Sequence, residues 1–262
     1  MLLVGTSGFS YRDWIGPFYP EGTVQSVMFE IYQQHFNTVE IDYTYYAFPS
    51  ARTMASLSGK AHEGFTFSVR THRSMTHEKG LEMEAVSSAA ARFREALRPL
   101  QDSDKMGCVL LQYPWSFRMS ASNVNKMLRT AEAFKDMQVA VEFRNDSWAN
   151  EEMVRLLRDN GLALCCVDEP RLPGLFPPLA VACADFSYFR FHGRNSGSWW
   201  KQAPGKDRYD YDYRDEELEE WIPGITKVMG EVTTTYIYMN NCHMGKAAKN
   251  AKKLREKLMG HA

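Results

Sequence analysis

A glutamate and an arginine stand in a segment that otherwise alternates like a half-buried strand, AVEFRNDSW at residues 140–148. Side chains along a strand point alternately to its two faces, so Val141 and Phe143 share one face while Glu142 and Arg144 share the other. A carboxylate and a guanidinium side by side can hold an anion or take part in proton transfer. The segment therefore predicts a strand with one apolar face and one charged face that lines a site.

The same alternation recurs in other strand-like segments, which place apolar residues on one face and polar groups on the other. In the second, third, seventh and eighth of these segments the polar face carries a charged, amide, hydroxyl or phenolic group near the strand end. A glutamine and an aspartate close the fourth and sixth segments in the phase that we expect to face inward. These polar positions are Glu40, Asp42, Ser68, Arg70, Gln112, Asp168, Arg190, His192, Tyr238 and Asn240.

Eight strand-like segments alternate with helix-like segments, which indicates a parallel sheet and, at this length, a closed (β/α)8 barrel of the TIM type. We therefore predict an α/β fold with one barrel domain over residues 1–262, and a doubly wound open sheet is the alternative. Pro170, Pro173, Pro177 and Pro178 break up the segment before the seventh strand, so we expect no long helix there. The expected strands are 2–6, 38–42, 65–70, 108–112, 138–144, 162–168, 188–193 and 235–240, with helices near 25–36, 50–60, 81–98, 121–135, 150–160, 213–229 and 246–259.

In such a barrel the polar faces point into the interior, and their polar ends meet at one opening. Enzymes of this fold build their active sites at the C-terminal ends of the strands. The alternative is a network of ion pairs that only stabilises the interior, but removing each ion from water costs on the order of several kcal/mol. A barrel built for stability alone would fill these layers with Val, Ile and Leu. We therefore predict a working pocket at this end of the barrel.

Several motifs occur in a fixed order along nearly the whole chain. They are GTSGFSYRDW at 5–14, VEIDYTYYAFP at 39–49, LLQYPWSF at 110–117, AVEFRNDSW at 140–148, YFRFHG at 188–193 and YIYMNN at 236–241. Together these motifs resemble the YecE-like family, known as domain of unknown function 72. The resemblance implies a TIM-type barrel and no established reaction.

One chemistry that the predicted pocket could support uses a divalent metal. Glu142, Asp168, His192 and Asn240 end the fifth to eighth strands, so they would line one half of the rim. Carboxylate and imidazole groups in such a series can hold a cation that polarises a carbonyl or activates water. Asn240 is a weak ligand, and neighbouring arginines add positive charge. We therefore commit to no metal, and a divalent cation held by these four residues stays an alternative.

A second chemistry is acid–base work without a metal. Glu40 and Glu142 lie on strands three apart in the barrel, and His192 is a further proton carrier. Paired carboxylates hydrolyse glycosides at separations of about 5–9.5 Å, and a wider separation is expected here. An arginine partner, with Arg70 or Arg190 as first candidates for Glu142, would keep each carboxylate ionised. Glu40, Glu142 and His192 are the predicted catalytic groups.

A third chemistry is anion recognition by the loops after the seventh and eighth strands. FHGRNSG at 191–197 and NNCHMGKAAKN at 240–250 place small residues, Arg194 and Lys246 before the last helix. In this fold such loops and a helix N-terminus form a common phosphate site. Tryptophans at 14, 115, 148, 199 and 200 follow strand ends and favour a flat polar ligand. The predicted substrate-binding residues are Arg70, Gln112, Arg144, Trp148, Arg190, Tyr238, Asn240 and Lys246.

Composition narrows the class of protein. A net charge of -1 argues against a generally basic nucleic-acid-binding surface, and five cysteines without metal-ligand spacing indicate a reducing, cytoplasmic setting. No segment predicts a membrane partner. We expect an enzyme of the hydrolase, isomerase or lyase type acting on a phosphorylated or sugar-containing small molecule. The alternatives are a nucleic-acid-binding barrel similar to endonuclease IV and a non-catalytic ligand-binding or scaffold barrel.

Overall fold

Eight parallel strands form one sheet in the order β1-β8-β7-β6-β5-β4-β3-β2. The computed structural model describes residues 1–78, 83–200 and 208–260. Each strand falls within two residues of a predicted one, and the sheet curls into a nearly closed barrel, which confirms the predicted fold. The strands are β1 Leu2–Thr6, β2 Thr38–Ile41, β3 Thr66–Arg70, β4 Met106–Gln112, β5 Gln138–Glu142, β6 Ala163–Asp168, β7 Phe186–Phe191 and β8 Thr234–Met239.

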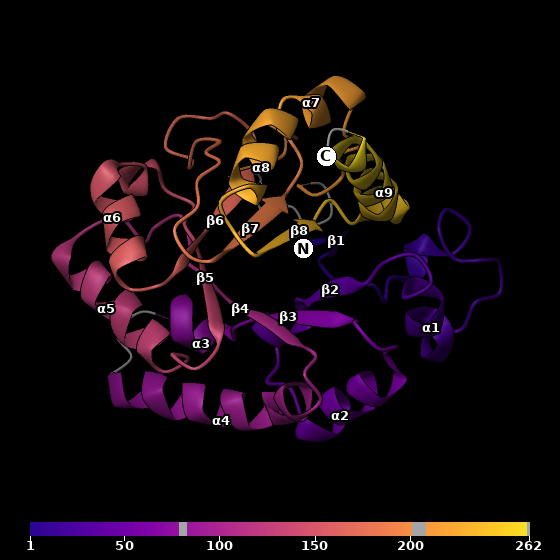
Figure 1. Cartoon of the computed structure of the whole chain (residues 1–262), viewed down its shortest axis with the longest axis horizontal. Coiled ribbons are helices and arrows are strands. Elements are labelled where there is room, and N and C mark those ends of the chain that lie inside the picture. Colours follow the sequence, from indigo (N-terminus) through magenta and orange to yellow (C-terminus); the bar gives the residue numbers. More distant parts are fainter. Residues whose placement is uncertain (79–82, 201–207, 261–262) are drawn as a thin grey trace.

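Helices follow most of the strands and surround the sheet (Figure 1). Side-chain oxygens of Ser50, Ser120 and Asn150 accept backbone N–H groups at the starts of three of them, as is typical of helix N-caps. The segment expected as one helix at 213–229 is two helices, because Pro223 fits only in the first turn of a new helix. The helices are α1 Met28–Tyr32, α2 Ala51–Lys60, α3 Arg73–Thr76, α4 Met83–Asp102, α5 Ala121–Glu132, α6 Glu151–Asp159, α7 Asp215–Glu219, α8 Ile222–Met229 and α9 Lys246–Met259.

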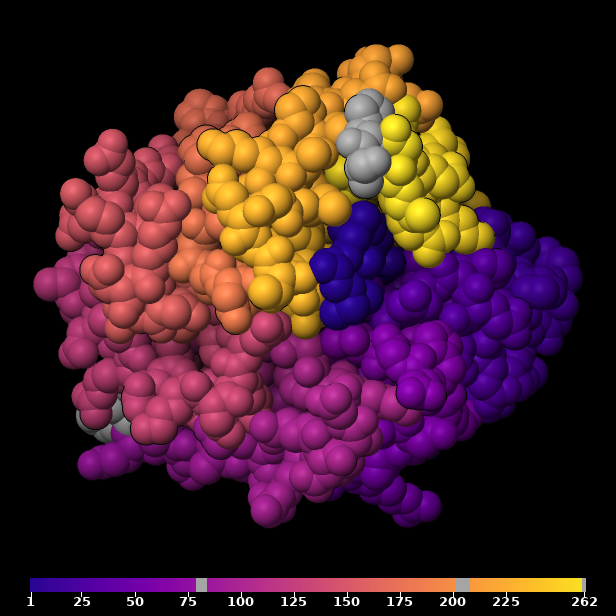
Figure 2. All heavy atoms as spheres, in the orientation of Figure 1, coloured from indigo at the N-terminus to yellow at the C-terminus, as the bar shows by residue number. Residues whose placement is uncertain are grey.

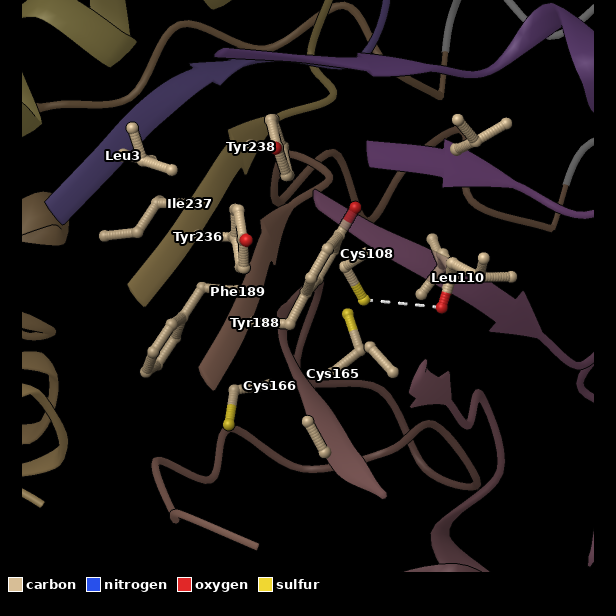
Figure 3. Close-up of a cluster of buried hydrophobic side chains, with 14 of the residues drawn as sticks. Leu3, Cys108, Leu110, Cys165, Cys166, Tyr188, Phe189, Tyr236, Ile237 and Tyr238 are labelled. Carbon is tan, nitrogen blue, oxygen red and sulfur yellow. Dashed lines mark hydrogen bonds between the residues drawn. The ribbon is translucent and has the colours of Figure 1, made fainter. Parts of the chain in front are cut away.

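The interior of the barrel is lined by the alternate side chains of every strand. Cα register pairs Glu142 with Gln112 and Arg190 with Tyr238, so the predicted inward residues of these strands share one face. Figure 3 shows Tyr188 pointing toward the thiols of two interior cysteines, while Phe189 points away toward the helices. Toward the N-terminal ends of the strands the interior is therefore aromatic and apolar, and charged groups begin toward the C-terminal ends.

The two ends of the sheet, β1 and β2, meet at a seam that has little backbone pairing. Ser7 and Glu40 form one bridge there, and the Tyr32 hydroxyl accepts from Thr6 N at 3.0 Å and donates to Thr38 O at 3.0 Å. A Cβ at Gly5 would lie 2.3 Å from the Thr38 carbonyl oxygen, so the close approach requires glycine. In Figure 2 the indigo start of the chain lies between the yellow C-terminal segments and the violet ones that follow it. A side-chain hydroxyl thus replaces part of the missing ladder.

We expect Tyr32→Phe to lower the free energy of unfolding by about 1–3 kcal/mol, because it leaves a buried N–H and a buried carbonyl unpaired at the seam. Denaturant unfolding of the variant and wild type measures this difference. Tyr43→Phe is the matched control, since that ring is exposed to solvent. An unchanged midpoint for Tyr32→Phe would show that the seam is held by other contacts.

Among the residues that the structure describes, no helix is long and apolar enough to cross a membrane.

Candidate functional site

Arg190 on β7 is the centre of a buried charge cluster at the C-terminal ends of the strands. Its Nη1 lies 2.6 Å from Glu142 Oε2 and 3.0 Å from Gln112 Oε1. Its Nη2 lies 2.7 Å from Glu40 Oε1 and 3.3 Å from Ser7 Oγ. One guanidinium therefore binds two carboxylates from opposite parts of the barrel, and the predicted pairing of Glu142 with Arg190 is confirmed.

A second layer of charge lies next to Glu142. Arg144 Nε is 2.9 Å from Glu142 Oε1, and the same guanidinium pairs with Glu169, which follows β6. His192 Nε2 is 3.2 Å from Glu142 Oε1, and Asn240 Nδ2 is 3.0 Å from His192 Nδ1. Because the amide nitrogen can only donate, His192 Nδ1 accepts, and the proton of the neutral ring is on the nitrogen that faces Glu142. Burial and Arg144 lower the pKa of His192 to about 3, so the ring is uncharged at neutral pH.

A third ion pair joins β2 to β3 on the other side of the opening. Arg70 Nη1 donates to Asp42 Oδ1 at 2.8 Å, and its guanidinium lies 3.9 Å from the centre of the Tyr45 ring. Arg190 Nη2 is 3.8 Å from the same carboxylate. Burial opposes ionisation of Asp42, but Arg70 and Arg190 outweigh it and lower the pKa of this carboxyl.

The carboxyl groups of the cluster differ in how firmly they are held ionised. Burial would raise the pKa of Glu142, but Arg190, Arg144 and His192 lower it well below the usual range. Burial raises the pKa of Glu40 although Arg190 opposes it. Burial also raises the pKa of Glu169, to about 7, against the effect of Arg144. Glu169 is therefore the carboxyl poised to gain or lose a proton near neutral pH.

We call the mouth cluster the four carboxylates and three guanidiniums named above, together with Gln112, His192 and Asn240. With every acid and arginine ionised and the histidine neutral, the cluster has a net charge of −1. Arg70, Gln112 and Asn240 are each 8% exposed, Arg144 is 7% and Glu169 is 5% exposed. The predicted catalytic residues Glu40, Glu142 and His192 have no exposed surface. A ligand that enters the opening would therefore contact the slightly exposed residues first, which are Arg70, Gln112, Asn240, Arg144 and Glu169.

Five buried polar atoms of the mouth cluster have no hydrogen-bond partner among the described residues. Two of them, Glu142 Oε1 and His192 Nε2, lie 3.2 Å from each other. The other three are Nε of Arg70, Nε of Arg190 and Oε1 of Glu169. Buried polar atoms of folded proteins are nearly always paired, so an unpaired donor and an unpaired acceptor at one opening favour a ligand.

The rim of the opening is aromatic. Trp199, after β7, lies with its ring 5.6 Å from the Arg144 guanidinium and 5.2 Å from that of Arg208. The ring of Tyr209 lies 6.4 Å from the His192 ring. Trp199 and Tyr209, which lie before and after residues 201–207 in the sequence, therefore both lie against the cluster.

Asp168 is not part of the cluster, which corrects one prediction. In the register it pairs with Phe191, whose face points toward the helices, because Cys165 and Val167 occupy the inward positions of β6. Its carboxylate accepts from Tyr213 Oη at 2.7 Å and from Trp221 Nε1 at 2.6 Å.

Of the proposed metal ligands, Glu142, His192 and Asn240 lie together in the mouth cluster, and Asp168 does not. Glu142 and His192 also bind each other, and two guanidiniums occupy the carboxylate. Over residues 1–78, 83–200 and 208–260 no group of three or more His, Cys, Asp or Glu is arranged to hold a metal ion. The side chains present do not fit the cation that the sequence suggested as an alternative.

Three predicted substrate-binding residues lie away from the opening. Trp148 is buried on the helix side of β5, where its ring stacks on Phe143 at 4.1 Å and its indole N–H donates to a backbone carbonyl. The hydroxyl of Tyr238 is engaged below the cluster, by Ser68 at 2.9 Å and by Thr38. These two predictions are wrong in placement, because residue type alone cannot show depth or side.

Lys246 also lies outside the cluster, since its ammonium pairs with Asp210. The backbone N–H of Met244, two residues earlier, donates to Asp13 Oδ2 at 2.9 Å. Carboxylates of the chain itself are thus bound to both the Lys246 ammonium and the Met244 N–H just before α9.

Glu169 is the site residue that the sequence interpretation missed. It comes directly after Asp168 and before Pro170, so the phase of β6 decides which acid of the pair points to the opening. The acidic doublet at a predicted strand end was the signal that could have found it.

The fold and this cluster define a (β/α)8 barrel with a buried charge network at the end of the strands where enzymes of this fold carry their active sites. The profile of the family described as "Protein of unknown function DUF72" matches residues 3–262. The chain belongs to this family.

Relatives match over nearly the full length. The UPF0759 protein YunF of Bacillus subtilis (strain 168) is 30% identical over 270 residues, covering 98% of this chain and 95% of the relative. The crystal structure of a DUF72 family protein from Thermotoga maritima MSB8 is 38% identical, with a TM-score of 0.91 over 99% of each chain. A second, from Enterococcus faecalis V583, is 26% identical, with a TM-score of 0.86 over 99% of this chain and 96% of the other. A D-psicose 3-epimerase shares the fold alone, at 14% identity and a TM-score of 0.54.

Proposed function

We propose that this protein is an enzyme that binds a small sugar-like molecule at the mouth cluster and transfers a proton to or from it. The proposal rests on the unpaired, buried polar atoms of Arg70 and Glu169, two slightly exposed residues of the mouth cluster, together with the pKa of the Glu169 carboxyl near neutrality. Such a carboxyl can act as a base or an acid at physiological pH.

The charge balance favours a polyhydroxylated ligand over a bare phosphate. Every arginine of the cluster already has a carboxylate partner, and the fully ionised cluster is negative. Sugar hydroxyls can donate to carboxylates and accept from guanidiniums at once, without adding charge. The half-buried ring of Tyr45 at the rim supplies apolar surface against which a sugar ring packs. A phosphate group on the substrate would point away from the buried residues of the mouth cluster.

Within this proposal the buried residues and the exposed residues have different roles. Of the three residues predicted as catalytic from the sequence, Glu40 and Glu142 bind Arg190 and Arg144, and His192 contacts Glu142. Arg70, Gln112, Arg144 and Asn240 bind substrate oxygens. Glu169 exchanges the proton, in a reaction of the isomerase, lyase or hydrolase type.

The test is a screen of aldoses, ketoses, their phosphates and nitrophenyl glycosides by ligand-observed NMR in D₂O. We expect at least one sugar to bind and then to exchange a carbon-bound hydrogen for deuterium or to lose its aglycone. Binding without either change would support a non-catalytic ligand-binding barrel instead. No sugar binding, with salt-dependent binding of single-stranded or abasic DNA, would replace the proposal by the nucleic-acid alternative.

A further inference from the structure

Two exposed tryptophan rings lie in contact just outside the mouth cluster. Trp115 follows β4 and is 39% exposed, and Trp200 follows β7 and is 52% exposed. Their ring centres are 5.4 Å apart, with the planes at 75°. The rings follow strands three apart in the barrel, so the segments after β4 and β7 meet at this contact.

Trp115 is held in a fixed orientation in spite of its exposure. Its indole Nε1 donates to the carbonyl of Gly174 at 2.8 Å, and the Arg118 guanidinium lies 5.6 Å from its ring centre. Gly174 has a φ of +82°, a backbone conformation that favours glycine and fixes the turn that presents this carbonyl. Because the exposed ring is already fixed in orientation, it would lose little conformational entropy when a flat ligand ring packs on it.

The tryptophan pair is continuous with the candidate site. Trp199, the neighbour of Trp200, covers Arg144 of the mouth cluster. Trp115 lies three residues after Gln112, which belongs to the mouth cluster. A ligand with one ring bound at the mouth cluster could therefore place a second, covalently linked ring on the tryptophan pair.

We infer that the Trp115–Trp200 pair is a second-ring subsite, and that the ligand is a disaccharide or a glycoside with a ring aglycone. This inference rests on the proposed function. Sugar rings present an apolar face that packs on indole, and they need no counter-charge. Arg171 and Arg194, after β6 and β7, are already paired with carboxylates, which disfavours the phosphodiester backbone of a nucleic acid.

The experiment compares glucose and galactose with cellobiose, maltose, lactose and phenyl glucoside, by calorimetric titration of the wild type and of Trp115→Ala. We expect a two-ring compound to bind the wild type roughly tenfold more tightly than its single ring. Trp115→Ala should remove that advantage and leave the affinity for the single ring unchanged. Trp200→Ala, which changes the more exposed ring, repeats the test if Trp115→Ala folds poorly, and Val24→Ala controls for loss of an exposed apolar side chain.

Equal affinity for one and two rings in the wild type would overturn the subsite and leave the proposed function intact. The same holds if Trp115→Ala weakens both kinds of ligand equally. Trp115-dependent binding of two-ring compounds without any turnover would support the subsite while overturning the proposed chemistry. Tryptophan-dependent binding of oligothymidylate in place of sugars would overturn the inference in favour of nucleic acid.

Discussion

Arg190→Ala is expected to lower the free energy of unfolding by about 3–5 kcal/mol, the usual cost of removing one partner of a buried ion pair. The substitution leaves Glu40 and Glu142 facing each other across a buried cavity without the guanidinium that binds both. For a chain of this size the melting temperature should fall by roughly 6–20 °C. Thermal and urea unfolding followed by circular dichroism measure the effect.

Acid should partly rescue Arg190→Ala. Burial already raises the folded-state pKa of Glu40, and loss of the guanidinium raises it further, whereas Glu142 keeps its contacts with Arg144 and His192. The protonated form of Glu40 therefore favours folding at low pH, and that contribution is lost as pH rises. The variant should therefore approach wild-type stability below neutral pH. Arg98→Ala, which removes an exposed ion pair on α4, should change little. Wild-type stability of Arg190→Ala at pH 8 would show that the two carboxylates find other partners.

Glu169→Gln is expected to lower turnover by about 10²–10⁴-fold on whichever sugar the wild type converts, because the amide cannot take or give the proton. The fold should persist, since the side chain keeps its shape and its contact with Arg144. Substrate affinity should change less than the rate. Glu219→Gln, an exposed acid paired with Lys257 on α9, is the control. Full activity in Glu169→Gln would move the proton transfer to another group.

The same variant has a pH signature that does not depend on knowing the substrate. The pKa of Glu169, about 7, lies above that of a glutamate in an unfolded chain, about 4.3. The folded state therefore binds this proton more tightly, and the resulting stability is complete below the unfolded value and lost as pH rises through 7. The wild type should lose stability relative to Glu169→Gln between about pH 5 and pH 8. A pH-independent difference in unfolding free energy would show that the carboxyl is not protonated in this range.

Alternation made the interior of the barrel predictable where a strand has one polar face. β5 and β7 each have a charged residue near the C-terminal end in the phase opposite to their large apolar residues, so the inward placement of Glu142 and Arg190, and of Arg144 two residues after Glu142, followed from the period of the strand. Long amphipathic helices such as α9 were equally clear, because their apolar stripe is continuous. These signals are local, and each is contained in a single element.

Prediction failed where the signal was not local. β6, ALCCVD, is apolar on both faces, so its phase cannot be derived from the pattern, and Asp168 was placed inward in place of Glu169. The depth of Trp148 depends on Phe117, which belongs to another segment. The engagement of Lys246 depends on Asp210, 36 residues away along the chain. Contacts between distant segments decide these positions, and no spacing within one segment encodes them.

The seam between β1 and β2 has a consequence for the order in which the barrel can be completed. β1 is paired along its length with β8, from Leu2 opposite Thr235 to Thr6 opposite Met239, whereas a single bridge joins its end to β2. A ribosome makes β8 after all the other strands, so the first strand is made first and receives its backbone partner last. The nascent chain therefore carries an open sheet edge throughout synthesis, and the barrel closes only when the final strand has emerged.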